Sequence, residues 1–168
     1  NAPAKGLQPF VIFTRMHLAL RDTDNDQAFE MVRVELMPDQ SVHVFPDNPI
    51  PVEGTALGEI FKSGEARDFD LSESADVEKY TDLQTWNAEG ERAILMVPMI
   101  AGGDQIGVLR LGSELGQSFK FNELQSASLI QRMANLSAVS IQNSRLFSSL
   151  GESQSFNQAV VQSIQQGI

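Results

Sequence analysis

The chain has 168 residues, of which 42% are hydrophobic, enough for one globular domain with an ordinary core. Its formal net charge of −10 repels phosphate backbones and anionic lipid heads, which argues against nucleic-acid and membrane-surface binding. It contains no cysteine, which excludes disulfides, thiolate metal sites, cysteine nucleophiles and thioether-linked cofactors. No window approaches the roughly 20 apolar residues of a membrane span, and the first residues lack a signal-peptide pattern, so we expect a cytoplasmic location.

The first third of the chain reads as an antiparallel meander. Residues 9–20 are mostly apolar and predict a strand, which ends at a dense run of turn-forming residues, 21–27. Residues 28–36 alternate between apolar and charged side chains and predict a second strand, and residues 40–46 predict a short third one. Strands that follow one another through polar turns pair antiparallel, so this part is expected to form a sheet.

Short helices are expected in the middle of the chain. Apolar residues at helical spacing predict a helix over residues 57–63, with Gly64 as the residue that ends it. Residues 65–71 predict a brief strand. Residues 74–90 predict one further helix, because apolar and aromatic side chains recur there at about every third position.

Two apolar runs around a glycine-rich turn predict a β-hairpin. Its strands are expected over residues 92–100 and 105–112, and Gly102 and Gly103 supply the positive φ angles that a tight turn needs. Pro98 cannot donate a ladder hydrogen bond. We therefore expect it at an edge, at a bulge, or where its nitrogen points away from a neighbouring strand.

The last part of the chain is expected to be one long helix. Asn122 and Gln125 have the spacing of a capping box, no proline follows them, and Gly151 weakens the helix locally by about 1 kcal/mol. Apolar and small polar residues separated by alternating steps of four and three form a heptad seam: Leu129, Met133, Leu136, Ser140, Asn143, Phe147, Leu150, Gln154, Asn157, Val161, Ile164 and Ile168. Because residues 120–150 carry few charges, we expect the helix to cover the sheet on one side and to pair with a second copy of the chain on the other, forming a homodimer.

The order of these elements and several short motifs are similar to those of a GAF domain, the small-molecule-binding and dimerising module of bacterial and eukaryotic signalling proteins. The motifs are the Gly54 and Gly58 pair, "SGEA" at 63–66, "VPM" at 97–99 with the glycine turn that follows, and "IGVL" at 106–109. Their order and spacing together carry the resemblance.

The resemblance implies an α+β, GAF-like fold over residues 9–148. This fold has a central antiparallel β-sheet of about five to six strands, with short helices on one face and the long C-terminal helix on the other. Residues 149–168 would then form a helical linker toward a further module. The segment "SFNQAVVQSIQQGI" at 155–168 resembles the first helix of a PAS domain, with a Ser/Gln-rich helical linker as the alternative.

In the GAF family the ligand pocket lies between the sheet and the short connecting helices. Mapped by position onto this sequence, its walls would be Ala56, Leu57, Tyr80, Gln84, Trp86, Arg92 and Ala93. Arg92 is the cation expected to meet an anionic ligand there. Tyr80 and Trp86 are the single tyrosine and tryptophan of the chain, and the sequence leaves open whether they line a cavity or belong to the core.

The sequence narrows the ligand class without identifying a cofactor. The asparagine–lysine–phenylalanine–aspartate–glutamate signature of cyclic-nucleotide GAF domains is not visible, so a cyclic nucleotide is not expected. The absence of cysteine excludes a covalently attached bilin and the methionine-sulfoxide-reducing activity of some family members. What remains is a non-covalent small molecule, or no ligand at all.

Few residues suggest catalysis or metal binding. Asp68 and Asp70 share a face of a predicted strand and are the candidates for acid–base chemistry, but exposed strand-end aspartates are more common. His17 and His43 fall on separate predicted strands without a local carboxylate pattern, so neither is expected to bind a metal. The acidic turn at 21–27 starts like a calcium-binding loop but lacks its later glycine and glutamate.

These observations predict a non-enzymatic regulatory module of a larger bacterial signal-transduction protein, for example a sensor histidine kinase of a two-component system. Ligand binding would shift the sheet against the C-terminal helix, and the paired helices would relay that change to an output module. The alternative is a ligand-free structural domain that only dimerises. No contact of this segment with nucleic acid or a membrane is expected.

Overall fold

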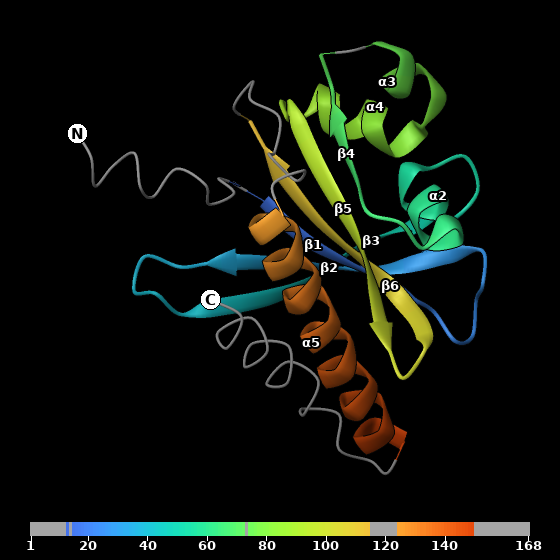
Figure 1. Ribbon diagram of the computed structural model, residues 1–168, viewed down its shortest axis with the longest axis vertical. Helices are drawn as coiled ribbons and strands as arrows, with labels where there is room; N and C mark the ends of the chain where they lie inside the picture. The colour runs from blue at the N-terminus through green and yellow to red at the C-terminus, as the bar shows by residue number, and fades with distance from the viewer. Residues whose placement is uncertain (1–12, 14, 73, 115–123, 150–168) are drawn as a thin grey trace.

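In the computed structural model, which describes residues 13, 15–72, 74–114 and 124–149, a six-stranded antiparallel sheet carries helices on both faces (Figure 1). The strands are β1 (Arg15–Arg21), β2 (Ala28–Leu36), β3 (Val42–Pro51), β4 (Arg67–Asp70), β5 (Ala93–Ala101) and β6 (Asp104–Ser113). The helices are α2 (Ala56–Ser63), α3 (Ser74–Lys79), α4 (Thr81–Ala88) and α5 (Leu124–Ser149). The order across the sheet is β3-β2-β1-β6-β5-β4. This is the α+β architecture that the sequence predicts.

The two faces of the sheet bury separate hydrophobic clusters. Alternation along each strand sends Leu18 and Leu109 into the cluster that contains the buried face of α5, whereas Ala19 and Val108 join the cluster under α2, α3 and α4. In Figure 1, α5 crosses one face, and α2, α3 and α4 are grouped together beside β4 and β5. Full burial of one leucine side chain contributes about 1.5–3 kcal/mol, so both layers hold the sheet in place.

Strand β3 is longer than the predicted segment 40–46. It runs to Pro51 and includes Pro46 and Pro49. These prolines are tolerated because β3 is an edge strand with β2 as its neighbour, so the missing N–H groups can face away from the sheet. The extension places Asp47 directly opposite Met31 of β2.

The helix predicted over residues 74–90 is two helices, α3 and α4, separated at Tyr80. Tyr80 has extended backbone angles, with φ −119° and ψ 127°. The N–H and the hydroxyl of Thr81 donate to the carbonyl of Gly54, at 3.0 and 3.3 Å. The single-helix prediction was wrong because this contact with the loop before α2 replaces one hydrogen bond of the helical ladder. The periodicity of the sequence carries no information about a partner so distant in the chain.

The hairpin β5–β6 forms around the predicted glycine turn, where Gly102 and Gly103 have φ angles of +58° and +83°. Pro98 lies beyond Met96, the last β5 residue that pairs with β4. Its carbonyl instead accepts a hydrogen bond from Gln131 of α5, at 3.0 Å. Among the described strands, none on this side of β5 requires the N–H that proline lacks.

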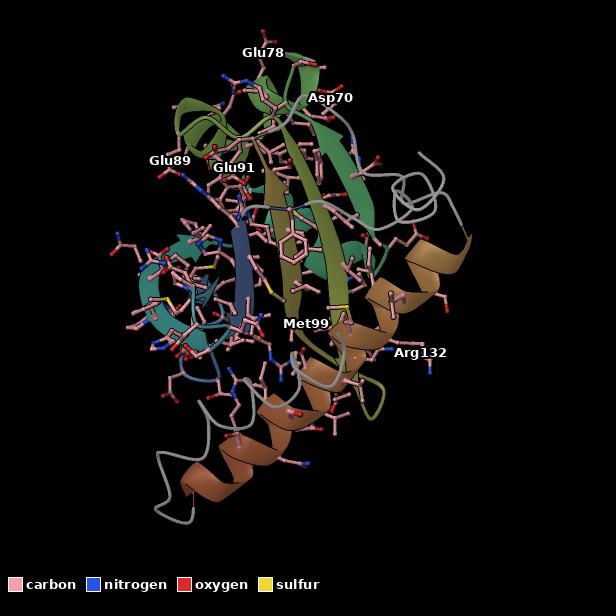
Figure 2. All side chains as sticks on the ribbon, turned by 90° about the vertical axis from the view of Figure 1, so that its left-hand side faces the viewer. Asp70, Glu78, Glu89, Glu91, Met99 and Arg132 are labelled. Atoms are coloured by element: carbon pink, nitrogen blue, oxygen red, sulfur yellow. The ribbon has the colours of Figure 1, made fainter. Side chains whose placement is uncertain are left out.

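Helix α5 packs on β5 and β6 through a narrow face of small and apolar residues, formed by Ile130, Ala134, Ser137, Ala138 and Ile141. In Figure 2, Met99 of β5 lies beneath this helix, whereas Arg132 points away from the sheet. The small side chains allow the helix to approach the sheet closely. The buried face is distinct from the predicted heptad seam.

The described part of the seam lies beside the buried face and is partly open to solvent. Leu129 and Leu136 are 41% and 47% exposed, and Asn143 is exposed too. Met133 and Ser140 are half-buried. The side chains of Phe147 and Leu150 lie outside the described part of the chain. So do residues 150–168 of the linker predicted over residues 149–168, with its PAS-like segment.

Within the described segments, no helix has the length and apolar character to cross a membrane.

Candidate functional site

A polar cavity of about 720 Å³ opens between α4 and the half of the sheet formed by β1, β2 and β3. Cavities of this size accommodate small organic ligands. The lining residues are Arg15, His17, Met31, Arg33, Glu35, Asp47, Asn48, Pro49, Ile50, Pro51, Thr55, Thr81, Asp82, Thr85, Trp86 and Glu89. The sheet therefore supplies the floor, and α4 with the loop before α2 supplies the opposite wall.

The wall of the cavity is held together by a buried carboxylate, Asp82. Its two oxygens accept hydrogen bonds from the backbone N–H groups of Ala56 and Leu57, at 2.8 and 3.0 Å, so α4 caps the first turn of α2. Thr55 caps the same helix by accepting from the N–H of Gly58. Burial raises the pKa of Asp82, and the backbone hydrogen bonds oppose that rise.

A chain of polar side chains begins at the cavity floor on β3 and β1 and continues beneath it to β6 and the residue that precedes β5 by two positions. Asp47 Oδ2 lies 3.3 Å from His17 Nε2, and His17 Nδ1 lies 2.8 Å from Arg110 Nη1. Arg110 in turn pairs with Glu91, and both of these side chains are fully buried. Because a guanidinium can only donate, His17 Nδ1 must accept, which places the imidazole proton on Nε2, where it donates to Asp47.

This environment keeps His17 uncharged. Burial is the main cause and the neighbouring Arg110 charge the second, and together they lower the pKa of His17 from 6.5 to about 4. The hydrogen bond to Asp47 opposes this shift but is outweighed. At neutral pH the imidazole is therefore a neutral link between the carboxylate of Asp47, at the cavity, and the buried guanidinium of Arg110.

The buried ion pair of Arg110 and Glu91 is also in contact with the cavity lining, through the ring of Trp86. The guanidinium carbon of Arg110 lies 4.0 Å from the centre of the Trp86 ring, and Trp86 lines the cavity. Glu91 is further approached by Arg15 Nη1 at 3.6 Å, which also lies 3.5 Å from Glu89. Burial raises the pKa of Glu91, and the Arg110 charge opposes it. Figure 2 shows Glu89 and Glu91 close together, where α4 leads into β5.

Of the seven residues that the resemblance assigns to a pocket, one lines this cavity, Trp86. Ala56 and Leu57 are fully buried in the cluster under the helices, and Ala93 faces the opposite side of the sheet, in the cluster with α5. Gln84 is exposed, and its amide donates to the carbonyl of Glu78. The structure thus gathers the cavity around other residues.

Two further pocket assignments have specific outcomes. Tyr80 is 5% exposed and packs edge-on against Phe69, with ring centres 6.2 Å apart, so it belongs to the core. Arg92 is exposed, and its guanidinium donates to the carbonyl and the side-chain oxygen of Asn87, at 3.3 and 2.9 Å. Both aromatic side chains therefore belong to the buried cluster under the helices, and Trp86 in addition lines the cavity.

The other candidate residues lie away from the cavity, except His17. Asp68 and Asp70 are exposed on the edge strand β4, and Asp70 accepts hydrogen bonds from Ser72. His43 is exposed and 3.1 Å from the hydroxyl of Ser41. In the described part of the chain, no group of three or more histidines and carboxylates is arranged to hold a metal ion.

The principal polar residues of the site, Asp47, Asp82, Glu91 and Arg110, were not selected by sequence reasoning. Two signals were present. Arg110 stands alone within the apolar run "IGVLRLG", and Glu91 directly precedes the apolar run of β5. A charged residue embedded in a predicted central strand requires a buried partner, and the acidic residue at the start of the adjacent hairpin strand is the nearest candidate.

No protein-family model matches the sequence, and no curated protein matches it. Solved structures, in contrast, do match the structure of this chain. The GAF domain of a two-component sensor histidine kinase from Bacillus halodurans superposes with a TM-score of 0.62 at 19% identity, covering 88% of this chain and 94% of that one. The chain has a GAF-like fold. Its resemblance to that domain in sequence is too low to transfer a function.

Two further GAF domains superpose at 14% identity, each with a TM-score of 0.58. One is from an Acinetobacter phosphoenolpyruvate-protein phosphotransferase and covers 88% of this chain and 78% of that one. The other is from a GAF domain/HD domain protein of Geobacter sulfurreducens and covers 85% and 89%. The GAF-like arrangement thus extends over most of the chain.

Proposed function

We propose that this chain is the small-molecule-sensing and dimerisation module of a larger cytoplasmic signalling protein of bacteria, such as a sensor histidine kinase, and that it is not itself an enzyme. The observation that carries the proposal is a cavity of about 720 Å³ on one face of the sheet, opposite a helix with an exposed apolar stripe. The GAF-like fold supports it, because one of the similar structures is a domain of a sensor histidine kinase.

The sheet provides a direct connection between the cavity and α5. On β6, Arg110 contacts Trp86 and His17 on the cavity side, whereas its neighbours Leu109 and Leu111 belong to the cluster that contains the buried face of α5. A ligand that moves α4 or the side chains of the floor would displace β6, and with it the surface on which α5 rests. A coupling of about 1–3 kcal/mol, usual for allosteric proteins, is sufficient for regulation.

The proposed dimer contact is the stripe of α5 that contains Leu129, Met133 and Leu136. Leu129 and Leu136 are exposed on one side of the helix with the half-buried Met133 between them, and a contiguous apolar stripe of this kind is typical of a surface that a partner covers. Their spacing of four and three residues suits pairing with the same helix of a second copy. Ser140 and Asn143 in the same seam would weaken one fixed register and thereby allow two arrangements.

Sedimentation tests the dimer. We expect the wild-type chain to be a dimer and the Leu129→Glu/Leu136→Glu variant to be a monomer with an unchanged circular dichroism spectrum. The control Ser128→Glu/Gln142→Glu adds the same charge to the same helix outside the seam, and it should remain dimeric. A monomeric wild type at high micromolar concentration would refute the dimer proposal, and so would a dimer that survives both substitutions in the seam.

Native mass spectrometry of freshly purified protein tests the sensing proposal. We expect a species that carries a small organic molecule, lost on denaturation. A chain that is always free of ligand, and that no compound stabilises against thermal unfolding, would favour the alternative of a structural dimerisation domain.

A further inference from the structure

The charges around the cavity identify the class of ligand it suits. The lining contains four carboxylates, Glu35, Asp47, Asp82 and Glu89, and two guanidinium groups, Arg15 and Arg33. His17 is neutral at physiological pH, because its pKa is about 4. Carboxylates therefore outnumber cations even when the buried Asp82 is left out, and the whole chain has a net charge of −10. The resulting field disfavours an anionic ligand and attracts a cationic one.

Both guanidinium groups of the lining are already engaged by carboxylates. Arg15 lies between Glu89 and Glu91, at 3.5 and 3.6 Å. Arg33 Nε lies 3.0 Å from Glu35 without forming a hydrogen bond, so the two groups interact as charges. These carboxylates offset the two guanidinium charges, and the lining as a whole therefore attracts phosphates or carboxylates weakly.

Asp47 is in a different position. Its hydrogen bonds are from the neutral imidazole of His17, at 3.3 Å, and from the backbone N–H of Asn48, at 2.8 Å. Among the described residues, no Lys or Arg nitrogen lies within ion-pairing distance of it, yet its side chain is 37% exposed at the cavity. This carboxylate can therefore accept a cationic group without breaking an existing ion pair.

Apolar surface adjoins Asp47. Met31 is its direct neighbour across the β2–β3 pair, and Ile50 lies on the same strand; both line the cavity. Trp86 contributes aromatic surface from α4. A ligand with a charged head at Asp47 can thus bury an apolar body against these side chains.

We propose, building on the sensing function proposed above, that the cavity binds a small organic amine in its protonated form, with the ammonium group paired to Asp47 and the apolar body against Met31, Ile50 and Trp86. Because Asp47 is hydrogen-bonded to His17, which contacts Arg110, the ammonium binds at the first member of the polar chain that leads into β6. Arg92, which the sequence assigns to an anionic ligand, takes no part.

Two sets of matched probes test the charge of the ligand on the wild-type protein. Phenethylamine, 2-phenylethanol and phenylacetate share one skeleton and differ in charge, as do butylamine, 1-butanol and butyrate. By calorimetry we expect at least one amine to bind saturably, about tenfold or more tightly than its alcohol and its acid. Equal or tighter binding of the alcohol or the acid would overturn the proposal and leave the sensing function intact.

The variant Asp47→Asn should lose that preference for the amine, with affinity falling about tenfold or more. The control Asp68→Asn removes the same charge from an exposed edge strand outside the cavity and should bind as the wild type does. An amine that binds Asp47→Asn undiminished would refute the role of Asp47. If none of the six probes binds, the proposal is tested by the molecule that native mass spectrometry detects on the purified protein. A neutral or anionic molecule would overturn the amine proposal alone. If no molecule is bound, the sensing function is overturned as well.

Discussion

Replacing His17 by glutamine gives a quantitative test of the polar chain beneath the cavity. The folded protein keeps His17 neutral, with a pKa of about 4, whereas in the unfolded chain the pKa returns to 6.5. Between these values the unfolded state binds a proton that the folded state does not, so stability falls as the pH falls from 6.5 toward 4. Relative to pH 8, this single group lowers the free energy of unfolding at pH 5 by about 2 kcal/mol.

The assay is urea unfolding at pH 8 and pH 5, on the wild type and on His17→Gln. Glutamine supplies an acceptor for Arg110 and a donor for Asp47 but has no proton to gain, while the surrounding carboxylates titrate in both proteins. The variant should therefore lose about 2 kcal/mol less than the wild type over this range. Equal losses would refute the reasoning. So would an NMR titration, in a His43→Gln background, that places the His17 midpoint near 6.5.

Three further substitutions test the packing around the site. Glu91→Gln leaves the buried guanidinium of Arg110 without its carboxylate and should lower the free energy of unfolding in urea by about 3 kcal/mol. A loss below about 1 kcal/mol would show that the ion pair is dispensable. Asp82→Ala removes the cap that α4 provides to α2 and should cost about 2 kcal/mol, with faster amide exchange in the first turn of α2 as the specific sign. Gly58→Ala places a Cβ 1.8 Å from the carbonyl oxygen of Val52 and should lower the melting temperature clearly; a neutral result would contradict the close approach.

The sequence was sufficient for those parts of the fold that depend on local patterns. Strand alternation placed β2 at its observed bounds, and Gly64, with a φ of +70°, ends α2 where predicted. The glycine turn was predicted correctly from the residues that such a turn requires. For Pro98 the missing N–H left three possible settings, and the structure shows the one in which its nitrogen points away from a neighbouring strand. The pairing seam of α5 stays a prediction: among its described members, Leu129, Leu136 and Asn143 are exposed and Met133 and Ser140 are half-buried.

The candidate site could not be predicted from local sequence patterns, because it is formed by contacts between residues that are distant in the chain. The break at Tyr80 results from a bond between Thr81 and Gly54, which lie far apart in the chain. Asp47 reaches the cavity because β3 extends beyond the predicted segment, on an edge that tolerates proline. The partners of Arg110 come from β1 and from the residue before β5, and the sequence does not specify how those segments meet.

The measurement that tests the account most directly is the distance between the two copies of α5 with the cavity empty and filled. Because the chain has no cysteine, Asn143→Cys introduces a single spin label at an exposed position of the seam. Double electron–electron resonance should then show one intermolecular distance in the free dimer and a different one when the cavity is saturated with the molecule identified by native mass spectrometry or by the amine panel. Identical distance distributions in the two states, or no intermolecular distance in either, would contradict a module that relays occupancy of its cavity through α5.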